Sequence, residues 1–503
     1  MANFIGIDLG TTFSAVAYLD ETGRPQIIEN EDGYNITPSV VSFHGPEGTE
    51  TEVGENPRMQ LGIDPDTAGR FKREMGTNKT YTLAGRELTP QMLSSLVLKK
   101  LKQIAEAKIG PVDEAVVTIP ANFANEAREA TLAAAKDAGL KVKYIINEPT
   151  AAALYYAFKN NEQMEGAYAV YDLGGGTFDV SIIRVSGNDV EVLSTEGISK
   201  LGGDDFDAEL VKIVRSKFNE ETGVDFEDQD YTKNDAEDNK KSLSRRDNTK
   251  IRVSCTKGKA VLQLTRAEFE ESISKLIAQT EMLCQNAVLE AGLEINDIQQ
   301  VFLVGGSTRV PCVREAVSRV FGQEPIAAAN VDEVVALGAA LYAAYKGDRT
   351  LLNPTQKQSV ERVSVQERTA KCFGTLAATQ SGGTIKQRNH IVIAKGEKIP
   401  CSASKSFYTM VDNQILVECE ITESGCIEED PTFCKIIWEG NLELPEGRPA
   451  GQEIKVTYSY DENQTMKCSF LDVSSGEVQE VDLQVGAGES PNEDLDIEDF
   501  IVE

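Results

Sequence analysis

The sequence predicts an α/β domain made of two similar halves, followed by an all-β domain. Three observations predict it. The stretches Ile5–Asp20 and Ala169–Val185 repeat one pattern: an apolar strand ends in an aspartate, the chain turns through Gly and Thr, and a second strand follows. Strand and helix patterns alternate from Met1 to about Gly347. Period-two alternation of apolar and polar residues then dominates to about Gly486.

Length and charge narrow the class of protein. A chain of 503 residues exceeds one ordinary hydrophobic core, so we expect two or three domains. The net charge of −31 would repel a nucleic-acid backbone or an anionic bilayer, so we expect neither as a partner. Met1 leads directly into the first strand and no run of ~20 apolar residues occurs, which predicts a cytoplasmic protein.

The nine cysteines all lie at or after Cys255. Their odd number and irregular spacing are not typical of a disulfide framework, so we expect reduced, buried thiols. The alternative is a metal cluster of Cys419, Cys426 and Cys434. Their gaps differ from the two-residue gaps of zinc sites, and the chain has only two histidines.

The α/β part, residues 1–347, contains clear individual elements. Acidic residues near its start and a glycine after its end predict a helix over Ala124–Leu140. Glu148 is expected to end a strand just before a proline. The remaining expected elements are strands at Ala115–Pro120 and Lys143–Pro149, an amphipathic helix at Thr265–Gly292, and a strand that runs into a third glycine turn at Val301–Pro311.

Composition divides the rest of the chain into three parts. Residues 348–366 are polar and are expected to be a linker. Residues 367–486 alternate at period two between turns rich in Asp, Asn and Ser, which predicts a β domain. Residues 487–503 carry seven acids and no base, so we expect a disordered acidic tail.

The duplicated turns indicate a polyphosphate ligand. Backbone N–H groups and hydroxyls of a Gly/Thr turn can point into one concavity, which suits phosphate oxygens. Asp8 and Asp172, which open the two turns, would repel those oxygens. A hydrated Mg²⁺ ion reconciles the two, because it keeps most of its waters and tolerates carboxylates at a distance. The two halves are therefore expected to close on a nucleotide.

The type of nucleotide site follows from motifs. The chain lacks GxxxxGK[ST] and the protein-kinase motif set, but it adds a third turn at Gly305–Arg309. The chain resembles the actin-like ATPase superfamily, and within it the seventy-kilodalton heat-shock chaperones, over about residues 3–485. The resemblance rests on GIDLGTT (from Gly6), FKREMG (with Lys72), VVTIPANF (Val116), INEPTAAAL (Ile146), YDLGGGTFDVSI (Tyr171), GGDDFD (Gly202), FLVGGSTRVP (Phe302), IAKGEKIP (Ile393) and FYTMVDNQ (Phe407).

The resemblance implies ribonuclease H-like halves, a β-sandwich that binds peptide, and ATP with Mg²⁺, with K⁺ as a further candidate. Lys72 would neutralise the γ-phosphate, Glu148 would position the attacking water, and Asp172 and Thr177 would complete the catalytic set. Asp8, Asp172 and Asp179 would organise the cations through water. The nucleotide would be held by Gly10, Thr11, Thr12, Phe13, Gly175, Gly176, Thr177, Glu237, Lys240, Lys241, Ser244, Gly305, Gly306, Ser307, Arg309 and Asp332.

The resemblance also implies an allosteric pair and one altered contact. Pro120 and Arg128 would report the nucleotide state to the β domain; taken singly, each could be a strand-ending proline or a solvated helix arginine. Lys241 stands where the family often has an arginine stacked on adenine. An ammonium group cannot lie flat on the base, so Arg309 is expected to stack alone.

Two larger departures concern the β domain. The family's leucine-rich linker strand is replaced by RVSVQERT (residues 362–369), so coupling is expected to be weaker or to use Val363 and Val365. After Val485 we expect no helical lid. Phe407, Val417 and Cys419 are the candidates for lining a peptide site, because alternation places them on one face; sandwich core is the equal alternative.

The expected function is that of an ATP-dependent chaperone that binds unfolded or extended polypeptide segments. A J-domain co-chaperone and a nucleotide-exchange factor are the implied partners. One alternative is a regulatory co-chaperone that binds ATP with little hydrolysis, which the altered linker favours and the intact Lys72 and Glu148 oppose. A metabolite kinase of the same superfamily is the other, and the β domain argues against it.

Overall fold

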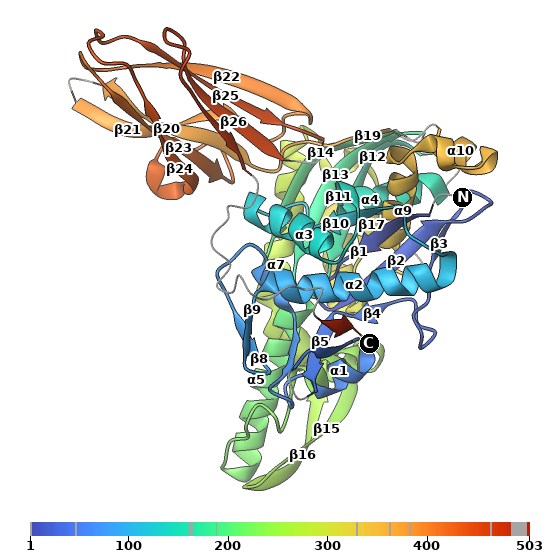
Figure 1. Ribbon diagram of the computed structural model, residues 1–503. Coiled ribbons are helices and arrows are strands. Elements are labelled where there is room, and N and C mark those ends of the chain that lie inside the picture. Colours follow the sequence, from blue (N-terminus) through green and yellow to red (C-terminus); the bar gives the residue numbers. More distant parts are fainter. Residues whose placement is uncertain are drawn as a thin grey trace. The chain divides into compact units, whose positions relative to one another are not determined.

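Two six-stranded sheets with matching strand order organise the first part of the computed structural model (Figure 1). The structure describes residues 3–45, 48–159, 164–187, 189–327, 330–361, 364–381, 384–462, 465–483 and 500–502. It divides into two compact units, Met1–Val365 with Glu489–Glu503, and Gln366–Gly488.

Five consecutive strands of each sheet correspond, whereas the sixth strand pairs at a different place in the two sheets. In the first sheet the order is β11 (Val142–Asn147), β10 (Glu114–Ile119), β1 (Phe4–Asp8), β2 (Phe13–Leu19) and β3 (Pro25–Ile27), with β4 (Thr37–Pro38) beside β2. In the second it is β18 (Ile326–Ala327), β17 (Ile298–Val304), β12 (Glu165–Leu173), β13 (Phe178–Ser186), β14 (Asp189–Ile198) and β19 (Ser364–Gln366). β1 and β12 each pair antiparallel with the next strand and parallel with β10 or β17. The predicted duplication therefore extends to strand order and direction.

Two helices, α4 (Glu148–Lys159) and α9 (Val334–Lys346), lie between the sheets. A Cβ added at Gly338 of α9 would lie 1.7 Å from the carbonyl oxygen of Ala151 in α4, so the two helices approach each other closely at this glycine. A Cβ at Gly6 of β1 would lie 2.1 Å from the amide nitrogen of Ala340. These glycines allow α9 to contact both α4 and the first sheet.

Further elements build two lobes around the sheets. The first lobe adds α2 (Pro90–Ile109), α3 (Asn125–Asp137), the short helices α1 (Glu55–Gln60) and η1 (Phe71–Glu74), the strands β5 (Val40–His44), β6 (Glu50–Val53) and β7 (Thr67–Gly69), and the hairpin of β8 (Tyr81–Leu83) and β9 (Arg86–Leu88). The second lobe adds α5 (Gly203–Thr222), α6 (Lys233–Arg245), the hairpin of β15 (Asn248–Cys255) and β16 (Gly258–Thr265), α7 (Arg266–Glu290), η2 (Ile295–Asp297), η3 (Gly306–Arg309) and α8 (Pro311–Phe321).

Local capping explains several boundaries. Thr89 caps α2 by accepting a hydrogen bond from the Met92 amide at 3.2 Å, and Thr265 and Glu268 form a reciprocal capping box at the start of α7. The expected helices over 124–140 and 265–292 are confirmed with slightly later starts and earlier ends. The expectation that Glu148 ends a strand is wrong, because β11 ends at Asn147 and Glu148 opens α4. Proline near a helix start is permitted, since its missing N–H would be unpaired there.

The segment expected as a linker is partly helical. η4 (Arg349–Leu351) is followed by α10 (Pro354–Val360), which Asn353 and Gln356 cap reciprocally. The Gln356 side chain is buried and donates to the carbonyl oxygen of Leu19 at 3.0 Å. Its polar residues therefore cap a helix and bind β2. Val365 packs against the core shared by α4 and α9, whereas Arg362 and Val363 lie outside the described residues.

The second unit consists of two four-stranded antiparallel sheets with an apolar core between them. One sheet contains β21 (Thr384–Ile393), β20 (Cys372–Ser381), β23 (Leu416–Ser424) and β24 (Lys435–Glu443), which η5 (Pro431–Phe433) precedes. The other contains β22 (Cys401–Tyr408), β25 (Glu453–Tyr460), β26 (Met466–Asp472) and β27 (Val478–Asp482). The alternating strands expected in this region are thus confirmed. All nine cysteines are free thiols, and burial raises the pKa of the Cys419 thiol to about 12.

The acidic tail departs from the expectation of disorder at its end. Residues 484–499 and 503 lie outside the described part, but β28 (Ile501–Val502) pairs in parallel with β6 of the first lobe. Phe500 is 1% exposed. Two apolar residues near the end of the tail, Phe500 and Val502, are buried, and an average over the acidic composition of the whole tail does not reveal them. Among the described helices, none is both long and apolar enough to cross a membrane.

Candidate functional site

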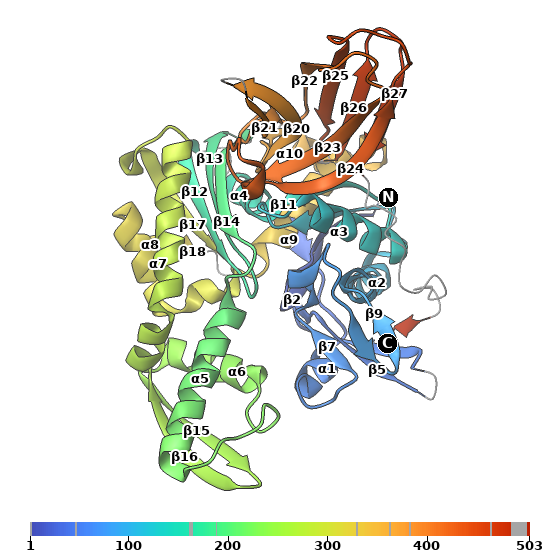
Figure 2. The ribbon, with the colours of Figure 1, turned by 90° about the vertical axis from the view of Figure 1, so that its left-hand side faces the viewer.

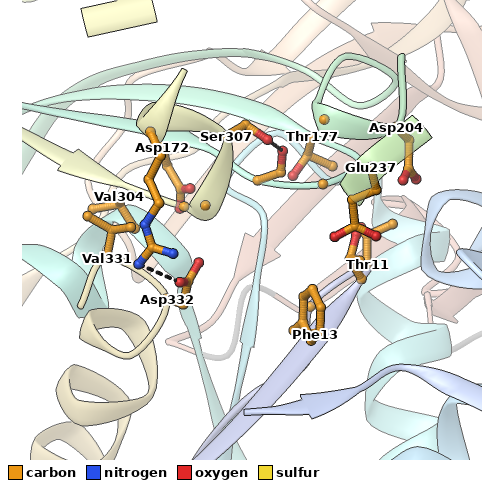
Figure 3. Close-up of a pocket in the computed structure, with 18 of the residues that line it drawn as sticks. Thr11, Phe13, Asp172, Thr177, Asp204, Glu237, Val304, Ser307, Val331 and Asp332 are labelled. Atoms are coloured by element: carbon orange, nitrogen blue, oxygen red, sulfur yellow. Dashed lines mark hydrogen bonds and ion pairs between the residues drawn. The ribbon is translucent and has the colours of Figure 1, made fainter. Parts of the chain in front are cut away.

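A cavity of about 440 Å³ lies between the two lobes, and most of the residues predicted to bind nucleotide line it (Figure 3). Thr11 and Phe13 come from the first lobe, and Asp172 and Thr177 from the second. The predicted residues among its lining are Asp8, Gly10, Thr11, Thr12, Phe13, Lys72, Glu148, Asp172, Gly175, Thr177, Glu237, Lys240, Lys241, Ser244, Gly305, Gly306, Ser307, Arg309 and Asp332. Gly176 and Asp179 are not part of that lining.

The two Gly/Thr turns face each other at close range. A Cβ added at Gly175 would lie 2.0 Å from Oγ1 of Thr12, so only glycine allows this approach. Oγ1 of Thr12 is buried and has no hydrogen-bond partner within the described part of the chain. A buried hydroxyl of this kind, next to a turn without side chains, fits a ligand with many acceptor oxygens.

Carboxylates gather beneath these turns. Burial and the neighbouring Glu148 raise the pKa of Asp8 to about 7, although Lys72 opposes the shift. Burial and the carboxylates of Glu148, Asp179 and Asp8 hold the pKa of Asp172 well above its usual range. The common causes are burial first and then repulsion between neighbouring carboxylates, which the Lys72 ammonium offsets only in part. A divalent cation at this place would reduce that repulsion.

The arrangement of acids fits a cation held through water. Among the described residues, no three His, Cys, Asp or Glu side chains converge closely enough to hold a metal directly. Asp179, which pairs opposite Asp172 across β12 and β13, is only 2% exposed and accepts a hydrogen bond from the Asn122 amide at 3.2 Å. Its carboxylate therefore lies behind the cavity rather than in its wall.

Lys72 and Glu148 form an ion pair in the cavity wall. Nζ of Lys72 lies 2.6 Å from Oε1 of Glu148, and both side chains are buried. The Lys72 ammonium also lies 5.6 Å from the centroid of the Phe123 ring. Burying two charges costs folding energy, and the pairing offsets that cost. A buried ion pair in a cavity wall is therefore typical of a site that acts on a charged ligand.

The cavity wall also contains Arg309 and Lys241, the two residues considered for stacking on the base. Arg309 pairs with Asp332 at 2.8 Å and its side chain is half exposed, so its flat guanidinium group remains accessible. Lys241 pairs with Glu237 at 2.7 Å, and its ammonium lies 5.4 Å from the centroid of the Phe13 ring. Both contacts of Lys241 use its positive charge, and neither requires the flat guanidinium group that would stack on a base.

Lys240 is held from two sides. Its ammonium lies 2.8 Å from Oδ1 of Asp207 and donates to the carbonyl oxygen of Gly203 at 3.0 Å. Burial raises the pKa of Asp207 to about 7, although Lys240 opposes the shift. Ser244 donates to the backbone of Lys240 at 2.9 Å, which turns its hydroxyl back onto α6.

Sequence reasoning missed a set of ion pairs that join the lobes next to the cavity. Arg70 donates to Asp204 at 2.8 Å, and Arg58 lies 3.3 Å from Glu237. Arg70 has a left-handed backbone (φ 62°), which is uncommon outside glycine. Asp204 belongs to the GGDDFD motif and Arg70 directly precedes FKREMG, but nothing in either motif says that they meet.

The structure places Pro120 in the loop between β10 and α3, and Arg128 in the first turn of α3, where its side chain contacts that loop. Pro120 follows β10 and is buried. Arg128 is 3% exposed and donates to the carbonyl oxygens of Ala121 and Phe123, both at 3.1 Å. The alternative that Arg128 is a solvated helix arginine is wrong, because the guanidinium holds the loop between β10 and α3. The same loop carries the Phe123 ring that lies over Lys72.

The peptide-site candidates lie in the second unit, where all three pack against the same apolar core between the sheets. Cys419 is 1% exposed inside the core, while Phe407 and Val417 pack partly against it. Phe407 belongs to one sheet, and Val417 and Cys419 to the other. Core packing is therefore the structural role of Cys419. Sequence reasoning did not single out the exposed apolar residues beside them: Tyr408, Met410, Val411, Ile415 and Leu416.

One comparison with known proteins identifies the family that this chain resembles. A family model described as Hsp70 protein matches residues 4–82 and 77–502. The match covers the cavity residues of both lobes and the two sheets of the second unit.

Proposed function

Because the chain belongs to the Hsp70 protein family, we propose that it is an ATP-dependent chaperone whose first unit hydrolyses Mg·ATP and whose second unit binds extended polypeptide. The observation that carries the proposal is the pair of facing Asp-Gly-Thr turns above buried, only partly compensated carboxylates. Such a pocket combines donors for phosphate oxygens with charge for a cation. A sugar or a peptide does not need both the donors for phosphate oxygens and the negative charge for a cation.

The residues present fit Mg²⁺ and a nucleotide. Asp8 and Asp172 would hold the cation through water, and Thr12 with the Gly175 backbone would donate to phosphate oxygens. When bound, Mg²⁺ neutralises phosphate charge and lowers the barrier to phosphoryl transfer. Arg309 would cover the base, because it is exposed on one side and fixed on the other by Asp332.

Lys72 and Glu148 have complementary roles in this proposal. The ionised Glu148 carboxylate can only accept hydrogen bonds, so it can orient a water molecule by accepting a hydrogen bond from it. The Lys72 ammonium fixes that carboxylate and supplies positive charge where negative charge develops on the phosphoryl oxygens. Their pairing at 2.6 Å holds both groups in one place before any ligand arrives.

Peptide binding is assigned to the exposed apolar residues around the turn between β22 and β23. Met410, Val411 and Ile415 are 43%, 59% and 50% exposed and lie within six residues of one another. An exposed apolar patch of this kind is typical of a binding surface rather than of ordinary solvent-facing structure. Backbone groups of an extended peptide and its apolar side chains are the chemistry that it suits.

The decisive experiment measures two quantities on the full chain. ATP hydrolysis should depend on Mg²⁺, stop with excess chelator, and fall at least roughly 100-fold in Glu148→Gln, whereas the exposed control Glu271→Gln should retain the wild-type rate. The affinity for an unfolded apolar peptide should differ between ATP and ADP. Hydrolysis at background level with unchanged peptide affinity would instead favour an ATP-binding regulator. Phosphorylation of a sugar would favour a metabolite kinase.

A further inference from the structure

The last described residues of the chain make a contact with the first lobe that the nucleotide site does not use (Figure 2). β28 lies parallel to β6, with Ile501 opposite Glu50 and Val502 opposite Thr51. The Ile501 amide donates to the carbonyl oxygen of Thr49 at 3.1 Å, and the Thr51 hydroxyl donates to that of Ile501 at 3.0 Å. The small sheet β5–β7 thus gains a strand at the edge of β6 that β5 does not cover.

The side chains of this segment alternate between the lobe and solvent. Phe500 is 1% exposed and Val502 is 7% exposed, whereas Ile501 between them is 62% exposed. The Phe500 ring meets Phe43 edge to face with ring centroids 5.8 Å apart. The Arg86 guanidinium lies 5.3 Å from the centroid of the same ring. One aromatic and one β-branched side chain therefore carry the contact, and the intervening residue contributes its backbone.

Polar groups of α2 fix the backbone of the segment. Nζ of Lys99 donates to the carbonyl oxygen of Phe500 at 2.9 Å, and Nε2 of Gln103 donates to that of Val502 at 3.4 Å. We call the set Phe43, Thr51, Arg86, Lys99 and Gln103 the tail site. It combines a sheet edge, an aromatic contact and two cations, and the segment before Phe500 carries six acids in residues 489–499.

We propose that the tail site is a peptide-binding site of the first lobe, distinct from the nucleotide cleft and from the second unit, and that it binds the Phe-Ile-Val end of this same chain. Its ligand class is an extended acidic peptide with an aromatic residue two places before a β-branched one. Strand addition supplies backbone hydrogen bonds, and the alternate side chains supply selectivity.

Intramolecular binding follows from the chain connection. Residues 484–499 join the second unit to the tail, and a tether between a ligand and its site gives an effective concentration that is commonly in the millimolar range. A site with a Kd of ~0.1 mM for free peptide would then be occupied about tenfold more often than empty. With the tail bound, the second unit is connected to the first unit at both ends, through β19 on one lobe and β28 on the other.

A labelled peptide of residues 494–503, DLDIEDFIVE, tests the proposal by fluorescence anisotropy. It should bind a chain that lacks residues 500–503 at least roughly tenfold more tightly than the full chain, whose own tail competes. A peptide with Phe500→Ala should bind roughly 30-fold more weakly, because the buried ring is lost. A peptide with Ile501→Ala should bind within about threefold of the parent, because Ile501 faces solvent.

The full chain provides a second measurement that does not depend on the truncated form. Phe500→Ala should speed hydrogen exchange in residues 48–53 by at least roughly tenfold, whereas Ile501→Ala should leave it nearly unchanged. Equal peptide binding by the truncated and full chains would overturn the proposal. So would equal exchange in the two variants. A concentration-dependent dimer that Phe500→Ala abolishes would show that the tail binds a second copy, which also contradicts binding within one chain.

Discussion

Arg70 in the first lobe donates a hydrogen bond to Asp204 in the second at 2.8 Å, and Asp204 is only 2% exposed. This pair joins the lobes next to the cavity, together with the pairs of Arg58 and Arg73. Separation of the two lobes would break these contacts. The pairs are therefore expected to govern how fast the lobes separate.

We predict that Arg70→Ala speeds the release of a fluorescent ADP analogue roughly tenfold, because the loss of a desolvated charge contact acts mainly on the dissociation rate. Stopped-flow dissociation measures it. Arg319→Ala is the control, since the ion pair of Arg319 with Glu281 lies within the second lobe. Equal release from both variants would show that the Arg70 pair does not hold the lobes together.

Lys72→Ala should reduce ATP hydrolysis by roughly 100-fold or more while ATP affinity changes only a few-fold. A charge directed at the reacting phosphoryl group stabilises the transition state more than the bound substrate. Single-turnover kinetics and equilibrium titration separate the two quantities. A parallel fall in hydrolysis and binding would mean that Lys72 holds the nucleotide rather than the transition state.

Asp207 predicts a pH dependence of the stability of the nucleotide-free first unit. Burial raises its pKa from the ordinary value of 3.8 to about 7, so between these values the folded state binds more protons than the unfolded state. Its contribution to the free energy of unfolding therefore decreases as pH rises from about 4 to 7. The slope of that free energy against pH corresponds to the uptake of at most about one proton. We expect Asp207→Asn to remove this slope.

The measurement for Asp207 is denaturant unfolding at several pH values without nucleotide, followed by a probe in the first unit. The useful quantity is the difference in slope between wild type and Asp207→Asn, because other groups titrate equally in both. Identical slopes would place the pKa of Asp207 near its ordinary value. Lys240 would then stabilise the charged form more strongly than burial opposes it.

Val411→Ser should weaken the binding of an apolar peptide at least roughly tenfold in both nucleotide states. The side chain is 59% exposed, so its replacement removes a contact surface without opening a cavity. Ile427→Ser is the control, because Ile427 is 73% exposed and follows the end of β23 that lies farthest along the strand from the turn between β22 and β23. Peptide affinities that fall equally in both variants would refute the assignment of this surface.

The sequence predicts most where one local pattern carries the information. The repeated strand, aspartate and Gly/Thr turn lies within about twenty residues in each copy, so the two similar halves and their Gly/Thr turns can be predicted from it. The same holds for the alternating strands of the second unit. The caps of Thr89 and Thr265 are equally local, because each acts on a residue three positions away, but they were not among the predictions.

Long-range contacts account for what the sequence did not predict. Arg70 and Asp204 are far apart in the sequence, and nothing near either residue indicates the other. The polar residues of α10 have the composition of a linker, and only the carbonyl of Leu19 explains why Gln356 is buried. The acidic composition of the tail concealed Phe500, because an average over many residues hides one buried ring.

The contact between Gly338 and Ala151 has a mechanical consequence. Where two backbones touch with no side chain between them, there are no interlocked groups that must separate before the helices turn. Rotation of one lobe about this point disturbs less packing than sliding it along the other. The crossing of α4 and α9 is thus suited to act as the pivot of the cleft. Gly338→Ala would place a methyl group between the two backbones at that pivot, so it should change the width at which the cleft rests.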